Sequence, residues 1–143
     1  MTIPKYDLDI LARTLYGEGR GEYNKFDGGL AALIAIGNVI MNRVQIGGWF
    51  GKTIAEVCQK PWQFSCWNKN DPNFNVIQNV SKDDPIFKIC QQVAAAIAEH
   101  KWPDLTKGCD HYFSRILSNS PKWAQNRVPK FCLGLHQFYQ LGV

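Results

Sequence analysis

Residues 15–22, with the sequence LYGEGRGE, decide how the N-terminal part of the chain folds. They follow a helical pattern that begins near Asp7, in which apolar residues recur three and four positions apart. Three glycines within five residues remove side chains and permit positive φ. We therefore expect the helix to end here, with its backbone open to a bound molecule and Glu18 at its exit.

A carboxylate at the end of a packed helix, with glycine on either side, is only partly hydrated. Its pKa is then raised, as a general acid requires, and this makes Glu18 a candidate catalytic acid. The alternative is that Glu18 and Glu22 are solvated residues at a helix terminus, paired with Arg13 or Arg20. The motifs further along the chain favour the catalytic interpretation.

The composition is that of one domain, spanning residues 1–143. A chain of 143 residues with 45% hydrophobic content can bury one sizeable core. The net charge is +4, which favours approach to anionic polymers. The Lys and Arg residues are scattered rather than clustered, so we expect no nucleic-acid partner.

The first residues lack the apolar core of a signal peptide, and we expect no stretch long enough to span a membrane. The sequence therefore predicts a soluble monomer, made in the cytoplasm without a leader. Five cysteines without a CxxC pair are expected to be reduced and buried, with a Cys58–Cys66 disulfide as the alternative.

The sequence predicts three further helices after the glycine-rich segment. Residues 28–44 are apolar on nearly every face and predict a buried central helix, on which Asn38 and Asn42 share one side. These two amides would either hold a loop or approach the site. Thr53 opens a capping box for a short helix, and Asp84 followed by proline caps an amphipathic helix that reaches about His100.

The other segments are rich in aromatic residues. Residues 61–79 lack a helical period and predict an ordered binding loop. Residues 111–113 and 131–139 have strand character and are expected to pair as an antiparallel ribbon, with a capped turn of helix at 120–124 between them. Aromatic faces beside amide, hydroxyl and imidazole groups suit sugar rings, so a glycan cleft is the hypothesis, although each aromatic alone can equally be core.

Several blocks of the sequence resemble the SleB-like cell-wall hydrolases, a family that includes spore cortex-lytic enzymes and phage lysins. The matching blocks occur in the expected order: residues 12–22, 36–44, 56–58, 63–67, 104–109, 111–113 and 134–138. The family often has alanine at the positions of Gly19 and Cys109, two small departures that leave Glu18 in place.

The resemblance implies an α+β, mainly helical, lysozyme-like single domain with a small antiparallel β ribbon. It also implies peptidoglycan as the substrate, cleavage of the MurNAc–GlcNAc bond and Glu18 as the catalytic acid. Because the chain lacks the secretion signal and wall-binding domain of many members, it is expected to be a phage-type lysin. Such an enzyme would reach the wall in the periplasm by holin-type release.

Two mechanisms of glycan cleavage are compatible with the sequence. A muramidase needs a second carboxylate, for which Glu22, Asp27 and Asp110 are candidates, whereas a lytic transglycosylase needs only one. No cofactor or metal is expected in either form. The residues expected to bind the sugars or stabilise the transition state are Gln63, Ser65, Thr106, His111, Tyr112, Trp123 and His136.

Other functions remain as alternatives. A zinc amidase would have to use His100, His111 and His136, which lack a ligand spacing. A thiol amidase could pair Cys109 with His136, although Cys109 is not at an evident helix N-terminus. A glycan-binding module without catalysis is the non-enzymatic alternative, and His136 can also be a structural histidine in a strand.

Overall fold

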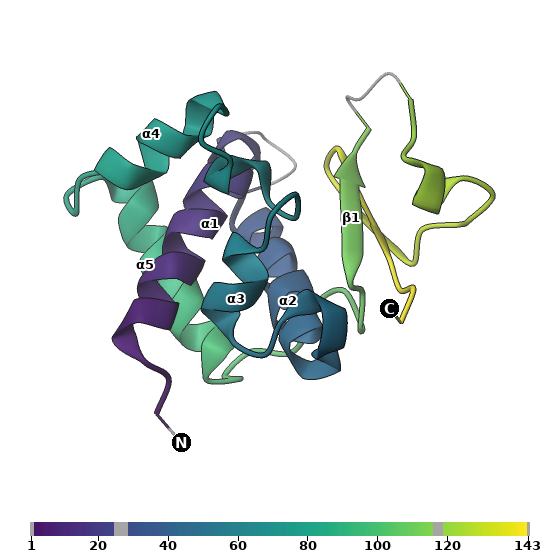
Figure 1. Cartoon of the computed structure of the whole chain (residues 1–143), viewed down its shortest axis with the longest axis horizontal. Coiled ribbons are helices and arrows are strands. Elements are labelled where there is room, and N and C mark those ends of the chain that lie inside the picture. The colour runs from purple at the N-terminus through teal and green to yellow at the C-terminus, as the bar shows by residue number, and fades with distance from the viewer. Residues whose placement is uncertain (1, 25–28, 116–118, 143) are drawn as a thin grey trace.

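The computed structural model describes residues 2–24, 29–115 and 119–142. A group of helices lies beside a small sheet, and the N-terminal helix runs through the middle of that group (Figure 1). The helices are α1 (Lys5–Tyr23), α2 (Gly29–Ile46), α3 (Ile54–Gln59), α4 (Pro72–Asn79) and α5 (Pro85–Ala98). The strands are β1 (His111–Ser114), β2 (Phe131–Leu133) and β3 (His136–Tyr139). This arrangement confirms the mainly helical α+β class with a small antiparallel sheet.

Helix α1 does not end at the glycines, and that prediction is wrong. Gly17, Gly19 and Gly21 all lie inside the helix. A Cβ atom at Gly17 would lie 2.7 Å from Cys66 Cβ, and one at Gly19 would lie 2.6 Å from Leu33 Cδ2. The glycines therefore let neighbouring segments approach α1 closely rather than terminate it, and Glu18 projects from a continuous helix.

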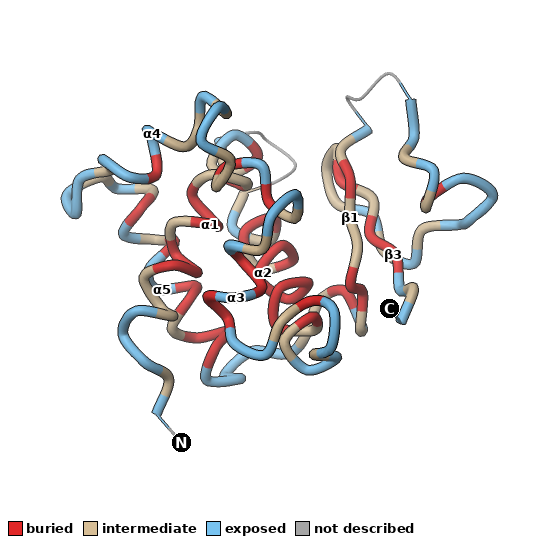
Figure 2. The backbone as a smooth tube through the Cα atoms, in the orientation of Figure 1, coloured by how far each residue is buried: buried red, intermediate tan, exposed pale blue. Residues whose placement is uncertain are grey.

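Helix α2 forms the centre of the core, as predicted. Its side chains at Leu33, Ile36 and Ile40 are fully buried, and buried positions are concentrated on the facing sides of α1, α2 and α5 (Figure 2). By length and apolar composition alone α2 could cross a membrane, contrary to the expectation from sequence. However, 56% of it is buried inside the fold, as in a core helix.

Asn38 and Asn42 hold a loop rather than line the site. Asn38 Oδ1 accepts a hydrogen bond from the Leu105 backbone N–H, and Asn42 Nδ2 donates to Asp104 Oδ2 and the Cys109 carbonyl. The loop between α5 and β1 is thereby tied to α2, and this tie places the start of the sheet.

The capping predictions hold for two helices. Thr53 Oγ1 accepts from the Glu56 N–H at the start of α3, and Asp84 Oδ1 accepts from the Ile86 and Phe87 N–H groups at the start of α5. The prediction that residues 61–79 form only a loop is wrong. Their second half is α4, which begins with Asp71 as N-cap and Pro72 at the first position, the same signal that opens α5.

The sheet has the strand order β1-β3-β2, with all pairs antiparallel, which confirms the predicted pairing. One face packs on α2 through Val39, Cys109 and Phe138, and the other is covered by Trp123 from the short 3-10 turn Lys122–Ala124. All five cysteines are free thiols, and four of them are buried as expected, whereas Cys132 is exposed.

Candidate active site

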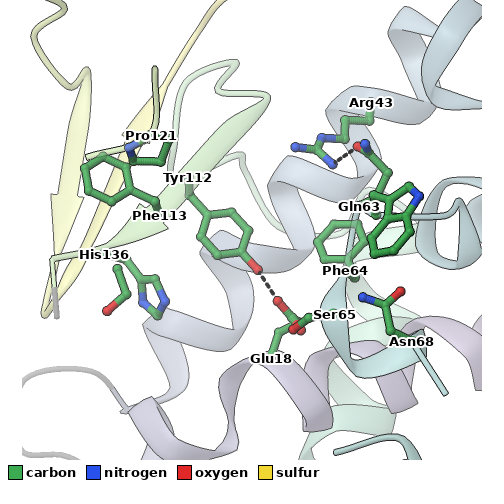
Figure 3. A pocket seen from close by; sticks show the side chains of 12 residues that line it. Glu18, Arg43, Gln63, Phe64, Ser65, Asn68, Tyr112, Phe113, Pro121 and His136 are labelled. Atoms are coloured by element: carbon green, nitrogen blue, oxygen red, sulfur yellow. Dashed lines mark hydrogen bonds between the residues drawn. The ribbon is translucent and has the colours of Figure 1, made fainter. Parts of the chain in front are cut away.

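A pocket of about 570 Å³ lies between the helices and the sheet (Figure 3). Glu18 comes from α1, Arg43 from α2, and Tyr112 from β1 on the opposite wall. The remaining lining residues are Trp62, Gln63, Phe64, Ser65, Asn68, Phe113, Ser114, Pro121 and His136. The pocket therefore forms only when segments nearly a hundred residues apart in sequence come together.

The Glu18 carboxyl group is partly buried on the helical wall. Tyr112 donates its phenolic O–H to Glu18 Oε1 at 3.0 Å, and the thiol and backbone N–H of Cys66 also donate to this carboxyl group. Burial raises the pKa of Glu18, because the charged form loses hydration, and this effect outweighs the three hydrogen bonds that lower it. A carboxyl group that holds its proton in this way is suited to general acid catalysis.

Tyr112 is a fixed donor on the opposite wall. Its ring packs against His136 at 5.3 Å and Phe138 at 5.5 Å between centroids. Burial and the nearby Glu18 carboxylate raise the pKa of Tyr112 well above its ordinary value. The phenol therefore stays neutral and continues to donate when Glu18 ionises.

We expect Tyr112→Phe to lower activity at least tenfold, because a hydrogen bond to an ionised group contributes about 1.5 kcal/mol or more. Since the phenol lowers the pKa of Glu18, its removal raises that pKa further, and the alkaline limb of the rate profile moves to higher pH. Measurement of the rate against pH checks both effects. Tyr139→Phe is the control, because that hydroxyl donates to Gln137 on the same sheet; an equal loss in both variants would contradict the prediction.

Arg43 fixes the orientation of Gln63. Arg43 Nη1 donates to Gln63 Oε1 at 2.7 Å and Nε donates to the Asp110 carbonyl at 2.8 Å, while the guanidinium lies over the rings of Phe50 and Phe64. A guanidinium can only donate, so Gln63 must present its carbonyl oxygen to Arg43. The Gln63 NH₂ group is then the part left to donate to a ligand.

Five of the residues expected at the site line the pocket together: Glu18, Gln63, Ser65, Tyr112 and His136. Thr106, His111 and Trp123 do not. The Thr106 hydroxyl is buried and donates to Asp104 Oδ1, and His111 Nδ1 donates to Asp110 Oδ1 at 2.8 Å. Trp123 packs against the rings of Phe113 and Tyr139.

Two of the three candidates for a second carboxylate lie outside the pocket lining. Glu22 is buried one turn beyond Glu18 and is outside the pocket lining. Asp110 is fully buried and accepts from the Leu141 and Gly142 N–H groups. Asp27 lies outside the described residues. Among the described residues that line the pocket, Glu18 is the only carboxylate.

Sequence reasoning missed Arg43, Phe113, Ser114 and Pro121 as lining residues. Trp62, Phe64 and Asn68 lie in the predicted binding loop 61–79 but were not named as site residues. Arg43 could have been recognised from the sequence, because it is the one charged residue in a helix that is predicted to be buried. Phe64 and Trp62 flank Gln63, and the aromatic content of that segment was the signal for a binding loop. Asn68, Ser114 and Pro121 have no distinguishing pattern in the sequence.

The amidase alternatives find little support in the geometry. Cys109 is buried in the cluster between α2 and the sheet, and its thiol donates to the Thr106 carbonyl. Burial raises the pKa of this thiol, so the thiolate nucleophile is disfavoured. Across residues 2–24, 29–115 and 119–142, no group of three or more His, Cys, Asp or Glu side chains could hold a metal ion.

Comparison with known proteins identifies related structures and the family of this chain. A comparison with curated proteins found no match. The catalytic domain of the Bacillus cereus SleB protein has a TM-score of 0.68 and 23% identity, covering 96% of this chain and 91% of that one. The catalytic domain of a germination-specific lytic transglycosylase, SleB from Bacillus anthracis, has a TM-score of 0.68 and 24% identity, covering 94% of each chain. The family model described as Cell Wall Hydrolase matches residues 29–139, and this chain therefore belongs to the cell wall hydrolase family.

Proposed function

We propose that the protein degrades peptidoglycan by cleaving the MurNAc–GlcNAc bond as a lytic transglycosylase, with Glu18 as both acid and base. The observation that carries the choice of mechanism is the single carboxylate among the described lining residues. The family match begins after Glu18, so the assignment of this residue rests on the pocket rather than on that match.

The reaction needs two proton transfers, and Glu18 takes part in both. Protonated Glu18 donates its proton to the bridging oxygen, and the bond from that oxygen to MurNAc C1 breaks. The carboxylate left behind is stabilised by the O–H of Tyr112 and the donors of Cys66. It then removes the proton from the MurNAc 6-hydroxyl as O6 bonds to C1, which closes a 1,6-anhydro ring. Glu18 is protonated again, and no water is consumed.

The other lining groups would position the sugars. The Gln63 NH₂ group, oriented by Arg43, is a donor for an acceptor oxygen of the substrate. The Ser65 hydroxyl and the His136 imidazole offer further polar contacts on opposite walls. Polar groups at fixed positions in a partly apolar pocket orient a bound ligand. A monomer supplies all of these residues.

A muramidase that hydrolyses the same bond is the second candidate, and the two differ in their products. We expect mass spectrometry of fragments released from purified peptidoglycan to show 1,6-anhydromuramic acid ends. Reducing ends would instead mean hydrolysis and require a second carboxylate, with Glu22 and Asp27 as the first to test. Released peptides with intact glycan would mean an amidase, and glycan binding without any fragments would mean a binding module.

A further inference from the structure

Trp62 differs from the other tryptophans near the pocket. Its side chain is 85% exposed, although it lines the pocket beside Gln63. Trp67 and Trp123 are tied into the fold: Trp67 Nε1 donates to Thr14 Oγ1, and Trp123 packs among aromatic rings. A large apolar side chain that stays in water at the rim of a pocket is unusual unless something covers it in use.

The backbone at Trp62 is held in a conformation that suits glycine. The Gln63 N–H donates to the Lys60 carbonyl at 3.1 Å, which closes a turn with Pro61 and Trp62 at its two central positions. Trp62 has φ of 68°, the left-handed value that the second central position of a type II turn requires. A side chain at this position is strained, so the fold alone would favour glycine here.

The turn also stands between two hollows. Trp62 lines the pocket that contains Glu18, whereas the adjacent Lys60 and Pro61 line a second hollow of about 620 Å³ with Tyr6 and Gln59. A polymer that occupied the first pocket and extended toward the second would pass over this turn. The flat apolar faces of an indole match the C–H faces of a sugar ring.

We propose that Trp62 is a stacking platform for a sugar ring of the peptidoglycan strand, outside the pair of sugars joined by the cleaved bond. The inference rests on the proposed function, because it takes the occupant of the pocket to be a glycan. It adds a binding position on the rim and gives the strand a direction, from the Glu18 pocket across Trp62 toward the second hollow.

The test compares Trp62→Gly, Trp62→Phe and Trp102→Ala on glycan strands of different lengths. Trp102 is 41% exposed and is not among the residues that line the two hollows, so it is the matched control. For Trp62→Gly we expect KM on long strands to rise about threefold to tenfold with kcat nearly unchanged, which is the range of an aromatic stacking contact. We expect the shortest cleaved strands to be unaffected, Trp62→Phe to recover most of the loss, and Trp102→Ala to match the wild type.

Thermal unfolding separates this role from a structural one. Because glycine relieves the strain, Trp62→Gly is expected to have a Tm equal to or above that of the wild type. A lower Tm with an equal loss on short and long strands would overturn the proposal, as would an unchanged KM on long strands. Binding of Glu18→Gln and of the Glu18→Gln, Trp62→Gly double variant to purified peptidoglycan gives a readout without turnover. If the wild type releases no fragments, the proposed function fails, but weaker binding of the double variant would still support the platform.

Discussion

Glu18→Gln is expected to abolish the release of glycan fragments. General acid–base catalysis by one side chain contributes about 10²–10⁴-fold, and Glu18 acts in both proton transfers, so the loss should lie at the upper end. Glutamine keeps the size of the side chain and can still accept from Tyr112, but its amide has no acidic proton to transfer to the bridging oxygen. Turnover of purified peptidoglycan is the measurement, and equal activity in the variant and the wild type would refute the assignment.

The same substitution should leave the fold at least as stable at neutral pH. The pKa of Glu18 is raised in the folded protein, so the folded state holds this proton more tightly than the unfolded state. The stability of the wild type therefore falls as pH rises from the unfolded pKa toward the raised folded pKa. Glu18→Gln lacks this dependence.

Unfolding temperatures of the wild type and Glu18→Gln between pH 4 and pH 8 test whether ionised Glu18 destabilises the folded state. The variant should have the higher Tm at neutral pH, and the difference should shrink as the pH falls and Glu18 becomes protonated. A wild type that is clearly more stable than Glu18→Gln at neutral pH would mean that the hydrogen bonds from Tyr112 and Cys66 outweigh the cost of burial.

Gly17→Ala is expected to be the most damaging conservative change in the helical core. The added Cβ would lie 2.7 Å from Cys66 Cβ and 2.9 Å from its sulfur, so the turn Ser65–Trp67 must move. Such overpacking costs about 1–3 kcal/mol. Because Cys66 donates to Glu18, the displacement should also lower activity.

Gly21→Ala is the matched control on the same helix. A Cβ there meets no atom within 4 Å, and alanine is favoured over glycine inside a helix by about 0.5–1 kcal/mol. The urea concentration at the midpoint of unfolding should therefore be lower than that of the wild type for Gly17→Ala and higher for Gly21→Ala. Stabilisation by both substitutions would show that the contact between Gly17 and Cys66 is loose, and destabilisation by both would show that the glycines in α1 serve backbone freedom instead.

The sequence singled out Glu18 as the candidate acid, and the fold places it in the pocket, but the backbone predicted around it was wrong. Glycine weakens a helix locally, and that local preference predicted an end at Gly17. The side chains that approach Gly17 and Gly19 come from residues 66, 77, 33 and 36, and such contacts are invisible to any local pattern. Tertiary packing therefore decided the outcome, and the helix continues to Tyr23.

The location of the site residues could be predicted only in part, again because it depends on contacts that are distant in sequence. Gln63 and Tyr112 were expected at the site because of their chemistry and the resemblance, and the fold brings both to the pocket. Thr106 has the same kind of hydroxyl chemistry, but Asp104 uses it to close a loop. Arg43 was overlooked because a cation in an apolar helix has no partner in the local sequence, and its partners Gln63 and Asp110 lie 20 and 67 positions away.

Two small hydrophobic clusters hold the sheet: one is shared with α2 and the other lies on the outer face of the sheet. Of the described sheet residues, only Tyr112 also packs against the main helical core. Proteins open locally in cooperative units with free energies below that of global unfolding, and we expect the sheet, which buries few residues against α2, to be such a unit. Each opening would carry Tyr112 away from Glu18, so the local stability of the sheet sets the fraction of molecules with an intact donor. A glycan bound across both walls of the pocket would stabilise the form in which the sheet is packed on the helices. It would therefore slow amide hydrogen exchange in β1 and β3. In this way the substrate itself would complete the assembly of the site.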